Sequence, residues 1–299
     1  MSWPGSISVA ARRGSVGDYI ELCKIRLVSL VLFTTGVGFF VGYPGEFTPT
    51  AAWLLMHTII GTALVACGSM AINQVMERDT DALMRRTCTR PVPDGRVGVV
   101  EAWVFGLTLN LLGVGYLLFV VNGLAAALAL LTSVVYVAAY TPLKRISTLN
   151  TIVGAVSGAI PPMIGYAAAE GELAPAAWSL FGILFVWQVP HFLGIAWMCR
   201  DDYARAGLQM LPVVDGDGRL TSRQIVLYSL LLLLASLLPS LLMVAGPVYF
   251  SAALVFGLAF VIVGLPLMVS RDQRSARQVF LASVIYLPLL LVFLMADRL

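Results

Sequence analysis

Charged and amide side chains crowd into the stretch NQVMERDTDALMRRTCTRP, which follows a long apolar run and holds three carboxylates and four arginines. On an unbroken helix Asn73, Glu77 and Asp81 stand at positions i, i+4 and i+8, within about 80° of one another on one face. Like charges at this spacing destabilise a helix, but oxygen-bearing side chains in a column suit a hard cation. Magnesium typically takes one or two carboxylates together with phosphate oxygens, so the column predicts a metal site.

Arginines follow this column within a few residues, at Arg85, Arg86 and Arg90. Arginine forks match phosphate oxygens with paired hydrogen bonds. Carboxylates for a metal and arginines for a polyanion in one segment therefore predict a diphosphate held through Mg²⁺. For the arginines alone, a solvated loop in which acids balance bases is the alternative.

A second acidic cluster opens the segment CRDDYARAGLQMLPVVDGDGRLTSR, with Asp201 and Asp202 at the end of another apolar run. A carboxylate pair facing the first cluster predicts a second metal on the other side of the diphosphate, an arrangement that neutralises a leaving group. Taken singly, an acid after an apolar run is usually a helix-end charge. The duplication favours the functional interpretation.

One of the two histidines, His191, lies well inside an apolar run, in FVWQVPHFLGIAW. Ionisable residues at membrane depth are costly and are functional hypotheses by default. Three roles stay open: a proton relay, an iron ligand, or the partner of the helix carbonyl that Pro190 leaves unpaired.

The stretch YTPLKRISTLNTIVGAVSGAIPPMIGY supplies Lys144 and Arg145, which are candidates for binding an anionic substrate. Two glycines four residues apart follow, and such spacing lets helices approach closely. The paired prolines, Pro161 and Pro162, kink a membrane helix and so help a bundle to open a central cavity. Ordinary helix packing is the alternative for each of these residues.

The elements that position these residues are membrane helices. The chain has 299 residues, of which 59% are hydrophobic and 12% charged, and its mean hydropathy is +0.90. These values exclude a soluble globular domain and predict an all-α polytopic membrane protein. The four scattered cysteines support neither a disulfide framework nor a zinc site. Apolar runs of roughly 20 residues, long enough to span a bilayer, predict nine helices around a central cavity, near residues 25–43, 53–76, 102–120, 123–140, 151–169, 175–198, 224–244, 248–269 and 278–296.

The basic residues orient these nine spans. All but one of the nineteen lie before the first span or in alternate connections, and only Arg298 lies on the other side. By the positive-inside rule the N-terminus and the loops 77–101 and 199–223 are cytoplasmic, and the C-terminus is outside. We expect a cytoplasmic N-terminal segment, 1–24, and one membrane domain, 25–299. The N-terminal segment lacks the apolar core of a signal peptide, so we expect a multi-pass protein of a prokaryotic plasma membrane.

Several motifs together resemble a known family. The N-x-x-x-[DE]-x-x-x-D column, the following RT..RP pattern and nine helices with two acidic loops resemble the UbiA-type intramembrane prenyltransferases. Within this family, the chain resembles the protohaem IX farnesyltransferase (haem O synthase) branch through the motifs YTPLKR, GAVSGAIPPMIGY, WQVPHF and DDYARAGLQMLP. The resemblance runs from about residue 18 to the C-terminus. The resemblance implies Mg²⁺-dependent transfer of farnesyl from farnesyl diphosphate to the 2-vinyl group of haem B, with water adding to give haem O.

The resemblance also implies roles for single residues. The positions four after Asp201 and Asp202 are Arg205 and Ala206, so the DxxxD of many family members is missing, and a full second metal site is not implied. The loop instead has the DYxxAG pattern of the haem branch. The implied assignments are Asn73, Glu77 and Asp81 to the first metal–diphosphate motif, Arg86 and Arg90 to its basic extension, His191 to the porphyrin, and Asp202 with Tyr203 to the second acidic loop, where Asp202 also serves as a metal ligand.

Other functions stay open at this stage. Within the family the acceptor could be an aromatic acid, a quinone precursor, a chlorin or a lipid. A membrane transporter would be expected to carry charges near the bilayer centre, whereas most charge here is at the span ends. A haem chaperone would not need the acidic column. The expected partners are farnesyl diphosphate, haem B and the lipid bilayer, with a downstream haem-modifying enzyme or a terminal oxidase as further candidates, and no nucleic acid.

Overall fold

The computed structural model describes residues 14–299, which form helices joined by loops and turns. Arg12 and Arg13, in the predicted N-terminal segment, lie outside the described residues. The elements are α1 (Val16–Leu22), α2 (Ile25–Gly42), α3 (Pro49–Met76), α4 (Arg78–Leu83), α5 (Val99–Tyr116), the π-helical η1 (Leu117–Val121), α6 (Gly123–Val134), the π-helical η2 (Val135–Tyr140), α7 (Thr141–Leu143), α8 (Asn150–Ala159), α9 (Pro161–Glu170), α10 (Pro175–Met198), α11 (Arg200–Arg205), α12 (Leu211–Val214), α13 (Arg219–Leu241), α14 (Pro247–Ser270) and α15 (Gln273–Ala296).

Nine helices of the described chain are long and apolar enough to cross a membrane, which confirms the predicted all-α polytopic fold. Three of the nine are composite: α5 runs on into η1, α6 continues through η2 and α7, and α8 is followed directly by α9. Large apolar side chains on the outside of the bundle, such as Phe119 and Val269, are more than four-fifths exposed. A lipid environment removes the cost of that exposure, because hydrocarbon tails are as apolar as the side chains.

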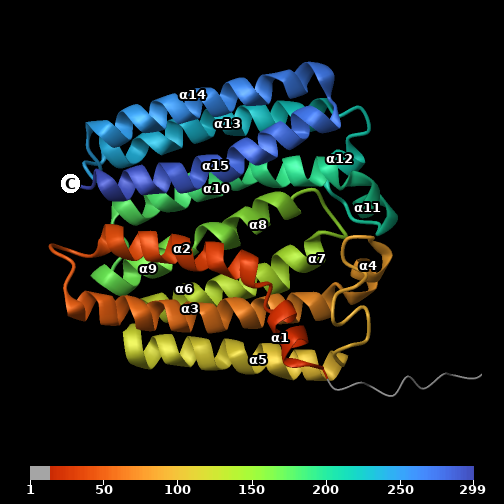
Figure 1. Ribbon diagram of the computed structural model, residues 1–299, viewed down its shortest axis with the longest axis horizontal. Coiled ribbons are helices and arrows are strands. Elements are labelled where there is room, and N and C mark those ends of the chain that lie inside the picture. The colour runs from red at the N-terminus through yellow and green to blue at the C-terminus, as the bar shows by residue number, and fades with distance from the viewer. Residues whose placement is uncertain (1–13) are drawn as a thin grey trace, which may run out of the picture.

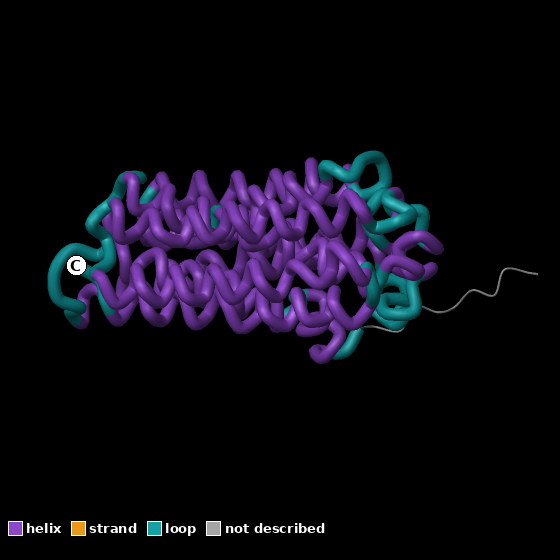
Figure 2. Tube along the Cα trace, turned by 90° about the horizontal axis from the view of Figure 1, so that it is seen from above, coloured by secondary structure: helices purple, strands orange, loops and turns teal. Residues whose placement is uncertain are grey.

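The spanning helices lie alongside one another in one elongated bundle, with connections gathered at its two ends (Figures 1 and 2). The short helices α4, α11 and α12 lie at the end opposite the C-terminus, and α1 lies beside α3 and α5 toward the same end (Figure 1). We call this the charged end, because the two acidic segments that follow α3 and α10 lie there.

Close helix crossings hold the bundle together. The contact between α2 and α9 is among the most extensive, and a Cβ added at Gly38 or Gly165 would collide with the backbone of Pro162 or Thr35. Small residues at such crossings bring backbones into contact. The span 150–170 breaks at Ile160, immediately before the paired prolines, as predicted. α10 packs against α8, α13 and α15, so it carries its polar side chains into the interior.

Candidate active site

The acidic column does not lie on one unbroken helix. α3 ends at Met76, Glu77 has φ −95° and ψ 2°, and α4 begins at Arg78. The N–H of Glu77 nevertheless donates to Asn73 O (3.0 Å), and the N–H of Asp81 donates to Glu77 O (2.7 Å). The i, i+4, i+8 spacing therefore survives across the break, although the premise of a continuous helix was wrong.

Asn73 is fully buried and bonded through both ends of its amide. Its Oδ1 accepts a hydrogen bond from Lys24 Nζ (2.7 Å), and its Nδ2 donates to Thr141 Oγ1 (3.1 Å). The amide thus joins α3 to the start of α2 and to α7. Sequence reasoning gave Lys24 only a topological role and did not single out Thr141.

Glu77 forms an ion pair with Lys144, Oε1 to Nζ 2.6 Å, and both side chains are less than one-fifth exposed. Burial alone would raise the pKa of Glu77, but the Lys144 and Lys24 ammonium groups more than offset burial and hold that pKa below its ordinary value. Burial likewise opposes the charge on Lys144, yet Glu77 holds its pKa well above the ordinary value. The ammonium also lies 4.3 Å from the centroid of the Tyr140 ring, a cation–π contact.

Asp81 is fully buried, and its two carboxylate oxygens differ. Oδ2 accepts from Arg90 Nη1 (2.6 Å), whereas Oδ1 is buried without a hydrogen-bond partner. Thr87 Oγ1 donates to the backbone carbonyl of Asp81 (2.9 Å) and fixes the turn that brings Arg90 back. An unpartnered buried carboxylate oxygen is costly, and it has the chemistry of a ligand for a hard cation.

No group of three or more His, Cys, Asp or Glu side chains in residues 14–299 could hold a metal ion. A cation at Asp81 would therefore need oxygens from an amide, a water or a bound phosphate, which is the usual manner of Mg²⁺. The residues present fit that requirement, because Glu77 and Asn73 stand one and two helical steps before Asp81 and both carry a side-chain oxygen.

The cluster carries more positive than negative charge. Lys24, Lys144 and Arg90 surround the carboxylates Glu77 and Asp81. Burial and the nearby Arg90 lower the pKa of the Lys24 ammonium to about 7, so a further anion at this point would be favoured electrostatically. The chain has only two lysines among nineteen basic residues, and both are in this cluster. That rarity is the sequence signal that would have identified Lys24.

The second acidic segment is more open. Asp201 is exposed beside Arg200, and Asp202 pairs with Arg205 of the same short helix (3.2 Å). Tyr203 packs on a buried apolar cluster that includes Met84 of the first segment. Burial raises the pKa of Tyr203, while the positive charges of Arg86 and Lys144 oppose the rise.

Backbone contacts attach this second segment to Lys144. The N–H of Gln209 donates to Lys144 O (2.7 Å), and the buried Asn150 amide donates to Gln209 O (2.9 Å). Lys144 therefore holds the first segment by its side chain and the second by its backbone. Arg86 and Arg145 are exposed and form no ion pair within the described chain, so the structure does not bring them into the cluster.

A cavity of about 250 Å³ lies within the bundle, with Tyr136 and Tyr140 near Lys144 at one part of its wall and His191 at another. Its wall is mostly aliphatic and aromatic, with Gln188 and a few hydroxyls as polar exceptions. A Cβ at Gly158 would collide with the Gln188 amide, so the small residue makes room for this polar group.

His191 faces the cavity from α10. Its Nδ1 is 2.8 Å from Ser283 Oγ of α15, and its ring stacks on Trp187 at 4.7 Å between centroids. Trp187 Nε1 in turn donates to Ser283 O (2.9 Å). One of the three predicted roles had His191 satisfy the carbonyl that Pro190 leaves unpaired. The hydrogen bond of its Nδ1 goes to Ser283 instead.

Relatives of known name cover nearly the whole chain. The family model described as "UbiA prenyltransferase family" matches residues 31–290. A "Protoheme IX farnesyltransferase" of Koribacter versatilis is 47% identical over 94% of this chain and 93% of its own length. Proteins of the same name from Solibacter usitatus and Legionella pneumophila are 46% and 39% identical, each over 94% of this chain and 98% and 95% of their own lengths.

Solved structures share the fold at low sequence identity. The structure of a digeranylgeranylglyceryl phosphate synthase is 16% identical, has a TM-score of 0.79 and covers 94% of this chain and 98% of its own. A UbiA homolog from Archaeoglobus fulgidus bound to GPP and Mg²⁺ is 16% identical, with a TM-score of 0.68 over 93% and 99% of the two chains. The family that the motifs predicted is confirmed by the family model and the relatives: the chain belongs to the UbiA prenyltransferase family of enzymes.

Proposed function

We propose that the protein transfers a farnesyl group from farnesyl diphosphate to a vinyl group of protohaem IX, with water adding to give haem O. The observation that carries the proposal is the buried cluster of two lysines and Arg90 around Asn73, Glu77 and Asp81, close to the wall of an apolar cavity that contains His191. The names of the relatives support protohaem and farnesyl as the two substrates.

Magnesium would be held by Asn73, Glu77 and Asp81 on the first segment, with Asp202 contributing from the second. The buried oxygen of Asp81 that has no partner supports this assignment. The A. fulgidus homolog is described as bound to Mg²⁺ and to the prenyl diphosphate GPP. When bound, Mg²⁺ would neutralise negative charge on the diphosphate oxygens.

The cations of the chain stabilise the leaving diphosphate. Lys24, Lys144 and Arg90 are fixed by short contacts to the acidic column, so they are organised before substrate arrives. Fixed charges in a site that excludes water stabilise developing charge more strongly than the same groups in solution. Arg86 and Arg145 are exposed and free to reach anionic groups of either substrate, including the haem propionates.

The cavity would hold the farnesyl chain and the vinyl group of the acceptor away from water. Breaking the allylic C–O bond gives the farnesyl carbon carbocation character, and the largely aliphatic wall keeps water from quenching it early. The vinyl carbon must lie within attack distance when this happens. His191 and Trp187, held by Ser283, present a flat aromatic surface against which a porphyrin can be oriented.

The charged end of the bundle would face the cytoplasm of a prokaryotic cell, with the loops 77–101 and 199–223 on that side and the C-terminus outside. The skew of basic residues supports this orientation. The single membrane domain, 25–299, would then take both amphiphilic substrates from the bilayer with their anionic groups at the cytoplasmic surface. Delivery of haem O to a haem-modifying enzyme or a terminal oxidase would follow.

The test is an assay of purified protein in detergent with haem B, farnesyl diphosphate and Mg²⁺, in which the haem fraction is analysed by mass spectrometry. The expected product is heavier by one farnesyl group and one hydroxyl group, since the remaining proton of the added water leaves with the diphosphate, and it is absent with EDTA or with Asp81→Ala. If farnesyl diphosphate is consumed with Mg²⁺ but haem stays unchanged, the acceptor is wrong and aromatic acids, quinone precursors, chlorins and lipids are tested. If folded protein changes neither substrate, the proposal fails.

A further inference from the structure

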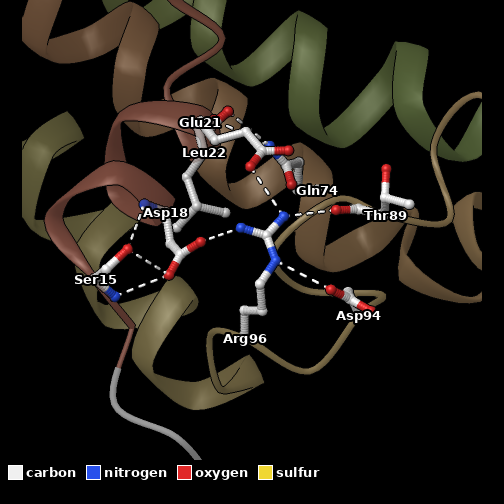
Figure 3. A network of polar contacts seen from close by, with 8 residues as sticks. All are labelled: Ser15, Asp18, Glu21, Leu22, Gln74, Thr89, Asp94 and Arg96. Carbon is white, nitrogen blue, oxygen red and sulfur yellow. Dashed lines mark hydrogen bonds and ion pairs between the residues drawn. The ribbon is translucent and has the colours of Figure 1, made fainter.

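A single guanidinium, that of Arg96, connects the short helix α1 to the loop that precedes α5. Arg96 forms an ion pair with Asp18, another with Glu21 at 2.9 Å and a third with Asp94 at 3.1 Å (Figure 3). Its Nη2 also donates to Thr89 O at 2.6 Å. The two acids of α1 and the two acceptors of the loop therefore share one cation.

α1 depends on such contacts for its position. It has only seven residues, and its apolar side chains Val16 and Ile20 are 78% and 54% exposed. A helix this short is marginal by itself. Ser15 caps its N-terminus and shares the Asp18 carboxylate with Arg96, and these hydrogen bonds lower the pKa of Asp18. Asp18 thus fixes the start of α1 to Arg96.

The other end of α1 is held by α3. Gln74 Nε2 donates to Glu21 O (3.2 Å) and Leu22 O (3.3 Å), and the Leu22 side chain is fully buried. Immediately afterwards Lys24 takes a left-handed backbone conformation, with φ 50° and ψ 54°. A residue with a Cβ adopts such a conformation only where its surroundings impose it. The turn directs the Lys24 ammonium to Asn73.

The loop that carries Arg96 is in turn fixed to the acidic column. Thr89, whose carbonyl Arg96 binds, directly precedes Arg90, and Arg90 pairs with Asp81. Through Thr89 and Arg90, the contacts of Arg96 therefore fix the position of α1 relative to Asp81. No contact in the described chain places Arg96 against the acidic column itself.

We infer that Arg96 is a positioning residue for the prenyl-transfer reaction: it locks α1 against the loop 89–96 and thereby holds Lys24 in the strained conformation that directs its ammonium to the diphosphate site. The inference rests on the proposed role of Lys24 in binding the diphosphate. A purely topological role, that of one more basic residue on the cytoplasmic side, would need none of these contacts.

The first test does not require activity. Lysine acylation by an N-hydroxysuccinimide acetate is mapped by mass spectrometry on substrate-free protein, where Lys144 serves as an internal control because the chain has only these two lysines. Arg96→Ala is expected to speed labelling of Lys24 by about fivefold or more, with the rate at Lys144 unchanged. Arg96→Gln, which keeps a hydrogen-bond donor at this position without adding a lysine, is expected to restore part of the protection. Arg219→Ala, which removes an exposed pair with Asp217, is the matched control and should change neither rate.

The second test is a double-mutant cycle on the KM for farnesyl diphosphate. Arg96→Ala is expected to raise KM about tenfold with a smaller fall in kcat, since Lys24 also stabilises the departing diphosphate, and to have less than about a twofold effect on KM in a Lys24→Met background. If Arg96→Ala fails to fold, Glu21→Gln removes one of the ion pairs and is expected to give smaller changes in the same directions. Unchanged Lys24 labelling in Arg96→Ala, or a KM effect that persists in Lys24→Met, would overturn the inference. Faster labelling in a protein whose wild type turns over no substrate would leave the positioning intact and reject the proposed function instead.

Discussion

The two acidic segments at the charged end are held in different ways. Asn73 and Glu77 find their partners far along the chain, at Lys24 and Lys144, and Asp81 pairs with Arg90 beyond the end of its own helix. In contrast, Asp201 and Asp202 pair, within residues 14–299, only with arginines of their own short helix. Long-range pairs fix several helices relative to one another, whereas local pairs break and re-form without moving a helix. The difference indicates a rigid first segment and an adaptable second one.

Burial explains the difference in energetic terms. A buried charge must be paired and hydrogen-bonded, because its desolvation cost is otherwise unmet. Asp81 is fully buried and the side chain of Asp201 is 92% exposed. The first segment therefore carries charge where charge is costly, which is the expected property of a preorganised binding site. If function divides between the segments in the same way, substitutions in the first segment should cost more activity than those in the second.

Asp81→Asn should have the largest effect on turnover. The change keeps the size of the side chain and removes the charge that would face the metal and the diphosphate, so kcat should fall by on the order of 10³-fold. Asp79→Asn is the matched control, since Asp79 is two residues away, exposed, and paired with its neighbour Arg78. Its kcat should stay within about twofold of wild type. Equal losses in the two variants would remove the distinction between buried and exposed acids.

Lys144→Gln should mainly reduce stability. It leaves Glu77 buried without its ion pair, and breaking a buried pair costs about 3–5 kcal/mol. Thermal unfolding in detergent should therefore show a clearly lowered midpoint. Adding Glu77→Gln should recover most of the stability but not the turnover, because the double variant has neither the unpaired charge nor the ligand. A double variant as unstable as Lys144→Gln would show that the pair is not the cause.

The sequence predicted some of this arrangement and missed the rest for physical reasons. The number of membrane spans follows from the apolar composition. The placement of Asn73, Glu77 and Asp81 on one face follows from helical periodicity, and backbone hydrogen bonds keep that periodicity across the break at Glu77. The partners could not be predicted in the same way. Lys24 lies 49 residues before Asn73 and Lys144 lies 67 after Glu77, and only the packing of α2, α3 and α7 brings them together.

His191→Ala should separate the two substrates. His191 faces the cavity and contacts none of the acidic residues in the described chain. Loss of the ring should raise the KM for haem by about tenfold, comparable to one aromatic contact, and leave the KM for farnesyl diphosphate unchanged. Steady-state kinetics with each substrate varied in turn measures both values. Ser283→Ala should give a smaller change in the same direction, since it removes only the hydrogen bond to the ring.

Asp202→Asn should have the smallest effect of the four. Its side chain is 18% exposed and already paired with Arg205, so the loss in kcat should be about tenfold or less, well below that of Asp81→Asn. Asp201→Asn, at the more exposed neighbour, should be close to wild type and is the control. The KM for Mg²⁺ decides between two interpretations of any loss. A rise for Asp202→Asn but not for Asp201→Asn supports a metal ligand on the adaptable segment. If the loss equals that of Asp81→Asn, both segments act as one rigid site, and the local pairing of Asp202 does not reflect its role.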